Sequence, residues 1–179
     1  METVNSNIKR VGICFGCFIP MHFGHLLMVT QTQNENDEII IGVCGYDNDR
    51  GKDFVPFKDR IKLVTKRYAQ EPGTTVAVID DHKIGLTGTF SKEAWKIWSN
   101  ELFQNAGYDP LDKTIEYTWY IGEQNYIDKL SELYPNHKFV KLDRHVINIS
   151  GTEIRNNAAA NENMILDDFK EYLRNKNII

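Results

Sequence analysis

Cysteine and long hydrophobic runs are both scarce in this chain. Three cysteines, Cys14, Cys17 and Cys44, occur among 179 residues. An odd and sparse set in apolar surroundings argues against a disulfide framework and for a reducing compartment. No apolar stretch approaches the roughly 18 residues that a membrane span needs. The polar N-terminus also lacks the hydrophobic run of a secretory signal, so we expect a cytoplasmic location and no membrane association.

An excess of positive charge is missing as well. The chain has 21 Lys and Arg against 25 Asp and Glu, a formal net charge of −4. This balance argues against a nucleic-acid partner held over the whole surface, although it allows a local basic pocket. Hydrophobic residues make up 41% and charged residues 26%, as in an ordinary globular protein. The length predicts one domain over residues 1–179 and leaves a homo-oligomer open.

What the chain does contain is a regular alternation of strand and helix patterns. Short apolar runs, typical of buried strands, occur at 11–15, 38–44, 74–79, 114–122 and 138–142. Helical patterns lie between and after them, at 23–33, 57–70, 91–106, 126–134 and 163–175. This order predicts an α/β fold in which a Rossmann-like parallel sheet carries helices on both faces.

A string of glycines and histidines follows the first expected strand, reading GCFIPMHFGH from residue 16 to residue 25. In a parallel sheet this turn lies at the carboxyl ends of the strands, where ligands bind. The N-terminus of the next helix offers unpaired N–H groups and partial positive charge to a phosphate. His22 and His25 can donate to one polyphosphate, while Gly16 and Gly24 let the backbone approach it.

The same region contains two pairs that suggest zinc. Cys14 and Cys17 form a C-x-x-C, and His22 and His25 form an H-x-x-H. Zinc pairs usually lie on a knuckle or loop, whereas Cys14 falls in an expected strand. The gap between the pairs is also too short for common zinc-finger spacing, and the cysteines do not open a helix as a thioredoxin-like pair does. We therefore expect no protein-held metal.

A second motif follows the last expected strand, where the chain reads DRHVINISGTEIR from residue 143 to residue 155. Ser150 and Glu153 have the S-x-x-E spacing of a capping box, which by itself is plain architecture. The hydroxyls of Ser150 and Thr152, with Arg155 one turn into the helix, are also suited to hold phosphate. This helix start is therefore a second candidate phosphate site.

The strings G-x-F-x-P-x-H-x-G-H and I-S-G-T-x-I-R together resemble the signatures of the nucleotidylyltransferase superfamily. Within it, the chain looks most like the nicotinamide-nucleotide adenylyltransferase domain of NadR-type proteins. Residues 45–51, the W-x-x-W-x-N pattern at 95–100, and the stretches 120–123 and 143–144 support this resemblance, which covers roughly residues 10–157.

The chain departs from the family in two ways. Cys17 stands where the family usually has Thr or Ser, so a hydroxyl is replaced by a weak thiol donor. No P-loop pattern G-x-x-x-x-G-K-[ST] occurs, and few residues precede the first strand. We therefore expect a transferase domain that stands alone, without kinase or repressor activity.

The resemblance implies transfer of AMP from ATP to nicotinamide mononucleotide, giving NAD and pyrophosphate, with Mg²⁺ carried by the ATP phosphates. It implies catalytic roles for His22, His25 and Arg155. The ATP-binding residues that it implies are Gly16, Cys17, Phe18, His22, Gly24, His25, Gly122, Arg144, Ser150, Thr152 and Arg155. Those for the mononucleotide are Trp95, Trp98, Arg50 and Asn100.

Other interpretations stay open. Trp95 and Trp98 share one helix face and are as suited to core packing as to stacking on a flat cationic ring. Arg50 could meet a phosphate or lie on a solvated turn. The same fold could serve another acceptor, such as phosphopantetheine or a cytidylyl-transfer substrate. A nucleotide sensor without catalysis is a further alternative, and the preference between amidated and deamidated mononucleotide is open.

Overall fold

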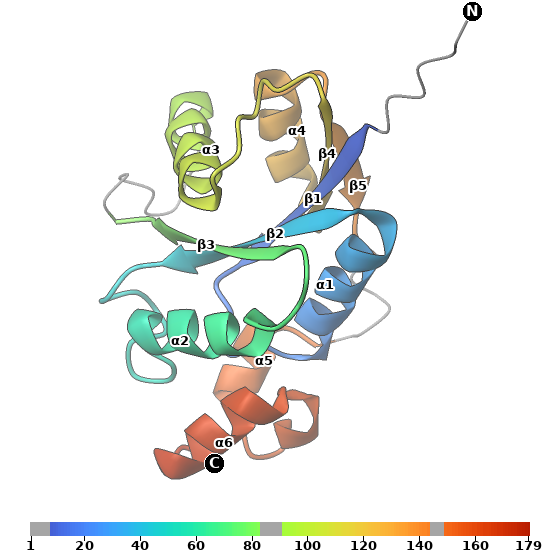
Figure 1. The fold of residues 1–179 in the computed structure, drawn as a ribbon. Coiled ribbons are helices and arrows are strands. Elements are labelled where there is room, and N and C mark those ends of the chain that lie inside the picture. The colour runs from blue at the N-terminus through green and yellow to red at the C-terminus, as the bar shows by residue number, and fades with distance from the viewer. Residues whose placement is uncertain (1–7, 83–90, 144–148) are drawn as a thin grey trace, which may run out of the picture.

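A parallel β-sheet forms the centre of the computed structural model, which describes residues 8–82, 91–143 and 149–179. Within these residues the sheet has five strands in the order β3-β2-β1-β4-β5, and every neighbouring pair is parallel (Figure 1). The strands are β1 Lys9–Gly16, β2 Glu38–Gly45, β3 Thr74–Asp80, β4 Ile115–Ile121 and β5 Lys138–Lys141. The predicted Rossmann-like sheet is confirmed.

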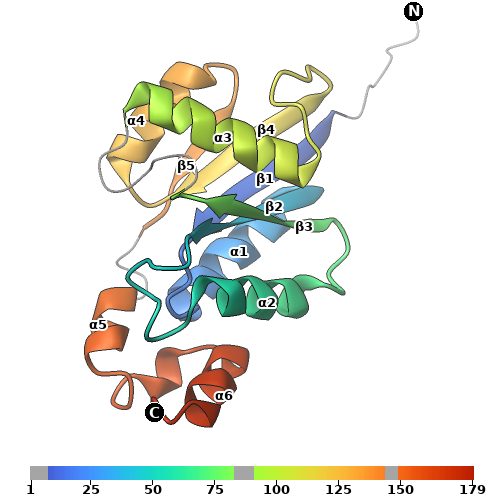
Figure 2. The same cartoon turned by 90° about the vertical axis from the view of Figure 1, so that its left-hand side faces the viewer.

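Helices cover both faces of the sheet. Helices α1 (Phe23–Glu35) and α2 (Phe57–Tyr68) lie on one face, and α3 (Lys92–Ala106) and α4 (Gln124–Leu133) lie on the other (Figures 1 and 2). The chain runs outward from β1 to β3 and then returns to the other side of β1 for β4. This reversal places a crevice at the carboxyl ends of β1 and β4, where α/β proteins bind ligands.

The strands are apolar on both sides because each side faces a separate helix layer. In β2, Ile39 and Ile41 join the core beneath α1 and α2, whereas Ile40 joins the core beneath α3. In β1, Ile13 and Cys14 divide in the same way between the two cores. Because successive strand side chains point to opposite faces, continuous apolar runs are what a sheet covered on both faces requires.

The C-terminal segment differs from the helix expected over residues 163–175. A 3₁₀ turn at Glu162–Met164 is followed by extended backbone, and helix α6 covers Asp167–Asn175. Ile165 forms an antiparallel bridge with His22, and the N–H of Leu166 donates to the carbonyl of Met21 at 3.2 Å. Both apolar side chains are buried, so tertiary packing and these bonds prevail over the helical pattern.

The remaining helices are short. Helix α5 covers Gly151–Asn156, and together with α6 it lies on the side of α2 that faces away from the sheet (Figure 2). In the described part of the chain, each helix is too short or too polar to cross a bilayer.

Candidate functional site

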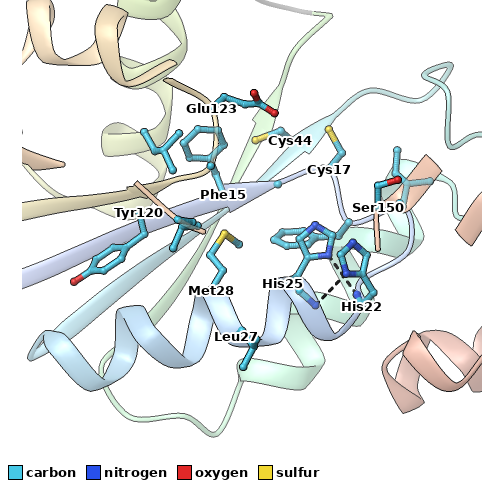
Figure 3. A pocket seen from close by; sticks show the side chains of 18 of the residues that line it. Phe15, Cys17, His22, His25, Leu27, Met28, Cys44, Tyr120, Glu123 and Ser150 are labelled. Atoms are coloured by element: carbon cyan, nitrogen blue, oxygen red, sulfur yellow. Dashed lines mark hydrogen bonds between the residues drawn. The ribbon is translucent and has the colours of Figure 1, made fainter. Parts of the chain in front are cut away.

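A cavity of about 990 Å³ opens at the carboxyl ends of the strands. Its wall combines the segments after β1, β2, β3 and β4 with one face of α1, the first turn of α5 and one face of α3. Figure 3 shows part of this wall, with His22 and His25 at the start of α1. The cavity brings together thirteen of the residues expected from sequence: Gly16, Cys17, Phe18, His22, Gly24, His25, Arg50, Trp95, Trp98, Gly122, Ser150, Thr152 and Arg155. Its volume is at the upper end of that of small-molecule sites.

Two residues expected at the site are not among these. Asn100 is exposed on α3 and, of the described residues, is not one that lines the cavity. It stands five positions after Trp95, which turns it about 140° around the helix axis from that buried side chain. Arg144 lies outside the described residues.

The two histidines cap helix α1 with their own rings. Nδ1 of His22 accepts the N–H of Gly24 at 3.1 Å, and the N–H of His22 donates to Nδ1 of His25 at 3.3 Å (Figure 3). This reciprocal pair is a capping box built from histidines instead of the usual Ser and Glu. A Cβ on Gly24 would lie 2.9 Å from the His22 ring, so the glycine between the histidines is a packing requirement.

This geometry determines which ring nitrogens carry protons. Because both Nδ1 atoms accept backbone N–H groups, each neutral ring carries its proton on Nε2. Burial lowers the pKa of His22 to about 4, so that ring is neutral at pH 7. The ring centroids are 3.9 Å apart, which places two N–H donors side by side in the cavity wall.

Phe18 packs against one ring of the histidine pair. It has a positive φ of 53°, its side chain is buried, and its ring packs edge-on against His25 with 4.9 Å between centroids. Only a few per cent of non-glycine residues adopt such a backbone conformation. Phe18 thus contributes to the cavity by holding the first turn in place.

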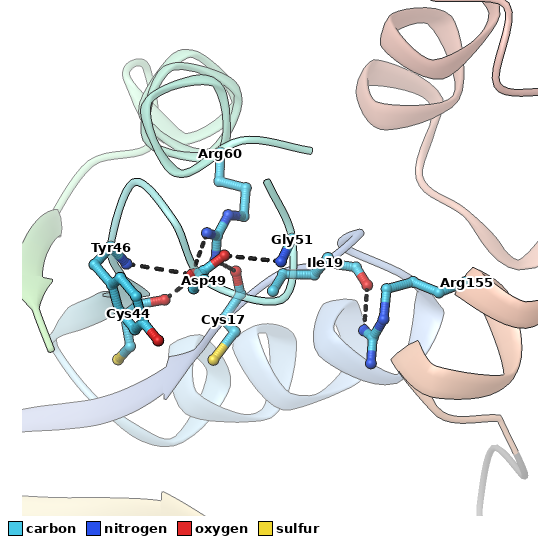
Figure 4. Close-up of polar contacts among 8 residues, drawn as sticks. All are labelled: Cys17, Ile19, Cys44, Tyr46, Asp49, Gly51, Arg60 and Arg155. Atoms are coloured by element: carbon cyan, nitrogen blue, oxygen red, sulfur yellow. Dashed lines mark hydrogen bonds and ion pairs between the residues drawn. The ribbon is translucent and has the colours of Figure 1, made fainter. Parts of the chain in front are cut away.

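The start of α5 lines the same cavity as the histidine pair. Ser150 Oγ accepts the N–H of Glu153 at 3.2 Å, and the Glu153 carboxylate accepts the N–H of Ser150 at 2.6 Å, so the predicted capping box is confirmed. Arg155 donates to the Thr152 hydroxyl at 3.0 Å. It also donates to the carbonyl of Ile19 at 2.9 Å (Figure 4). This arginine therefore joins the two motifs, although 136 positions separate it from Ile19.

A buried ion pair, which the sequence analysis did not identify, supports the strand ends. Arg60 of α2 is fully buried and donates to the carbonyls of Cys17 at 2.9 Å and Cys44 at 3.3 Å (Figure 4). It also pairs with Asp49 at 2.5 Å. The available signal was a cation three residues after Phe57 and four before Val64, which places it on the apolar face of the helix.

The Asp49 carboxylate organises the loop after β2. It accepts the N–H of Tyr46 at 3.2 Å and the N–H of Gly51 at 2.8 Å (Figure 4). The loop carries the exposed Arg50 to the cavity wall. Arg60 thus links the turn after β1 and the Arg50 loop through one side chain.

Aromatic side chains form the wall on the α3 side. Trp95 and Trp98 are each 1% exposed and meet edge to face with 5.1 Å between ring centroids. The Phe15 ring packs on both, at 6.4 Å and 4.7 Å. The tryptophans are therefore core residues that also line the cavity, and their stacking on a ligand ring stays a prediction.

Asp81, which follows β3 directly, was also missed. It lines the cavity beside the tryptophans, and burial, followed by the nearby Asp49 carboxylate among others, raises its pKa to about 7 although a hydrogen bond from Trp98 opposes the shift. The signal in the sequence was a polar residue at the end of an apolar strand, next to the similar Asp80.

The cysteines do not form a metal site with the histidines. Burial raises the pKa of Cys14 to about 12 and also raises the pKa values of Cys17 and Cys44, so the thiols stay protonated at neutral pH. Among the described residues, three or more His, Cys, Asp or Glu side chains nowhere gather as metal ligands would.

Comparison with known proteins gives consistent matches. The family described as cytidylyltransferase-like matches residues 13–157. The trifunctional NAD biosynthesis/regulator protein NadR of Salmonella typhimurium is 24% identical over 160 residues, which cover 83% of this chain and 37% of that protein.

Two solved structures have the same fold over most of the chain. The crystal structure of a NadR protein in complex with NR has a TM-score of 0.74 and 28% identity, covering 90% of this chain and 44% of that one. A crystal structure of NadR in complex with NAD and AMP-PNP has a TM-score of 0.72 at 28% identity, covering 90% of this chain and 46% of that one. The chain therefore spans less than half the length of these relatives.

Proposed function

The chain belongs to the cytidylyltransferase-like family of nucleotidyltransferases, and from this premise we propose that it transfers AMP from ATP to nicotinamide mononucleotide. The products are NAD and pyrophosphate. The observation that carries the proposal is one cavity that joins the histidine pair and the start of α5 to the tryptophan pair. The distant similarity to NadR, whose solved complex contains NAD and AMP-PNP, supports the same substrates.

In this reaction a phosphate oxygen of the mononucleotide attacks the α-phosphorus of ATP. The new P–O bond forms as the bond to the β-phosphate breaks, and pyrophosphate leaves with its electron pair. The attacking group is already anionic, so the protein needs neither a nucleophile nor a strong base. Its task is to align two phosphates and to stabilise the negative charge of the transition state.

The phosphate-facing wall is suited to that task. His22 and His25 direct Nε2–H donors at the triphosphate, and the neutral state of His22 keeps its donor available over a wide pH range. Arg155 exchanges the Ile19 carbonyl, its partner in this structure, for oxygens of the departing pyrophosphate. ATP enters as its magnesium complex, with the metal held by phosphates and water.

The other end of the cavity receives the mononucleotide. Trp95 and Trp98 give the flat, cationic nicotinamide ring an aromatic surface. Arg50, positioned by Asp49 and Arg60, meets the mononucleotide phosphate.

Incubation of the purified chain with MgATP and nicotinamide mononucleotide tests the proposal. We expect NAD and equimolar pyrophosphate, resolved by chromatography and a coupled pyrophosphate assay. His25→Ala removes one transition-state donor and should lower kcat by roughly 100-fold or more. Lys66→Ala, an exposed change on α2 outside the cavity, is the matched control and should leave kcat unchanged.

Parallel incubations separate the alternatives. Transfer to phosphopantetheine, or transfer from CTP in place of ATP, without NAD formation would replace the proposed acceptor or donor. Measurable ATP binding with no transfer to any of these acceptors would instead favour a sensor.

A further inference from the structure

Asp81 occupies the cavity wall beside the tryptophan pair, and phosphate transfer requires nothing of it. It follows the last residue of β3 and lines the cavity with Trp95 and Trp98. Its Oδ1 atom is buried and finds no hydrogen-bond partner within the described part of the chain. A buried polar atom without a partner costs free energy, so a ligand that supplies the partner gains affinity there.

The surroundings of Asp81 disfavour a further anion beside its carboxyl. Burial and the neighbouring carboxylates of Asp49, Asp80 and Glu101 all disfavour further negative charge at this point. In the described part of the wall the cations are Arg50 and Arg155, and Arg155 already donates to Thr152 and Ile19. A second carboxylate brought beside Asp81 would therefore meet repulsion, whereas an N–H group would meet an acceptor.

We propose that Asp81 selects between the two pyridine mononucleotides by the group at position 3 of the ring. Oδ1 accepts an N–H of the carboxamide in nicotinamide mononucleotide, whereas the carboxylate of nicotinate mononucleotide offers Oδ1 no donor. A carboxamide carries two donors and one acceptor, whereas an ionised carboxylate carries acceptors alone. This inference rests on the proposed function and adds to it the residue that distinguishes the amidated from the deamidated mononucleotide.

The position of Trp98 supports the assignment. Its side chain hydrogen-bonds to the Asp81 carboxyl, and it lines the cavity where the proposed function places the pyridine ring. One side chain thus contacts the Asp81 carboxyl and also lines the part of the cavity proposed for the ring. A site built around a hydrogen-bonding substrate group rejects the analogue that lacks it, because the buried partner is then left unpaired.

The test compares kcat/KM for the two mononucleotides at saturating MgATP. The wild-type chain should prefer the amide. Asp81→Asn keeps the shape of the side chain and can turn its NH₂ toward a carboxylate, so the amide-to-acid ratio should fall by roughly tenfold or more, mainly through KM. Asp47→Asn removes the same charge from an exposed position outside the cavity and should leave the ratio unchanged.

Calorimetric binding of each mononucleotide distinguishes failure of this inference from failure of the proposed function. Two outcomes would overturn the role of Asp81 while adenylyl transfer still holds. One is dinucleotide formation with an amide-to-acid ratio of kcat/KM that Asp81→Asn leaves unchanged, and the other is a wild-type preference for the acid. Absence of both binding and turnover with either mononucleotide overturns both proposals. Thermal unfolding of each variant shows whether a change in ratio comes from an intact fold.

Discussion

His22 uses its two ring nitrogens for different purposes. Nδ1 caps α1 by accepting the N–H of Gly24, and Nε2 keeps the proton that the proposed function directs at phosphate. Histidine is not among the residues preferred at helix N-caps, so the sequence motif indicated a ligand and not a cap. The cap explains why the ring has one orientation and one tautomer before any ligand arrives.

The lowered pKa of His22 gives a testable pH dependence of stability. The folded pKa of about 4 lies below the ordinary value of 6.5, so the unfolded chain protonates first as the pH falls. The associated stability is fully present above pH 6.5 and is lost progressively toward pH 4. His22→Asn keeps a good N-cap without this titration, so between pH 7.5 and pH 5 the variant should lose about 2 kcal/mol less unfolding free energy than the wild type.

Urea unfolding at the two pH values measures this difference. The remaining histidines are common to both chains, so their titration cancels in the comparison. Identical pH dependence in the two chains would show that folding does not lower the pKa of His22.

At the scale of elements, Arg60 connects three segments that meet at the cavity. It ties α2 to the end of β1 through Cys17, to the end of β2 through Cys44, and to the following loop through Asp49. Gly45 at the bend has a positive φ of 155°, and a Cβ there would lie 2.5 Å from the Asp49 carboxylate and 2.8 Å from the guanidinium of Arg60. The strand ends and the loop therefore hold one arrangement as a unit.

Removal of either member of the ion pair should be strongly destabilising. Arg60→Met leaves the Asp49 carboxylate buried without its cation and should lower the unfolding free energy by about 3–5 kcal/mol. The double variant Asp49→Asn with Arg60→Met should cost less than the sum of the two single changes, because no lone charge remains. Chemical denaturation of the three variants gives the cycle, and strict additivity would rule out a direct interaction.

For the whole molecule, the C-terminal segment completes the core beneath α1 and α2. Phe169 and Leu173 of α6 are fully buried in that core. Polar contacts add to the attachment, with Arg67 donating to Asp168 at 2.8 Å and the Tyr172 hydroxyl donating to Asp59 at 2.7 Å. The extended link at Ile165 also bridges to His22, so this segment reaches the turn that carries the histidine pair.

Phe169→Ala should therefore destabilise the entire fold and not α6 alone. We expect a loss of about 3–5 kcal/mol of unfolding free energy, from lost burial and the cavity left behind. Glu171→Ala, an exposed change on the same helix, is the control and should shift stability little. Loss of the α6 helical signal in circular dichroism before the main transition would show instead that the segment unfolds independently.

Much of this protein follows from its sequence alone. The parallel sheet was predictable because strands buried on both faces need continuous apolar runs, and the runs at β1, β2 and β3 supply them. The two motifs could be placed at the carboxyl ends of strands because each directly follows one, and the α5 capping box depends on residues three apart. Strand runs and capping residues are local patterns, so the spacing of residues along the chain is enough to predict them.

Tertiary structure decided the rest. Three contacts at the cavity could not be read from local spacing: Arg155 with Ile19, Arg60 with Asp49, and Asp81 with Trp98. No periodic pattern in the sequence links the members of these pairs. The exposed position of Asn100 depended on how α3 turns when it packs on the sheet. The late start of α6 depended on the contacts of Ile165 and Leu166 with the turn before α1. The sequence determined which side chains lie near a strand end, whereas only the packed fold determined which of them face one another, because burial and hydrogen-bond partners are properties of the assembled core.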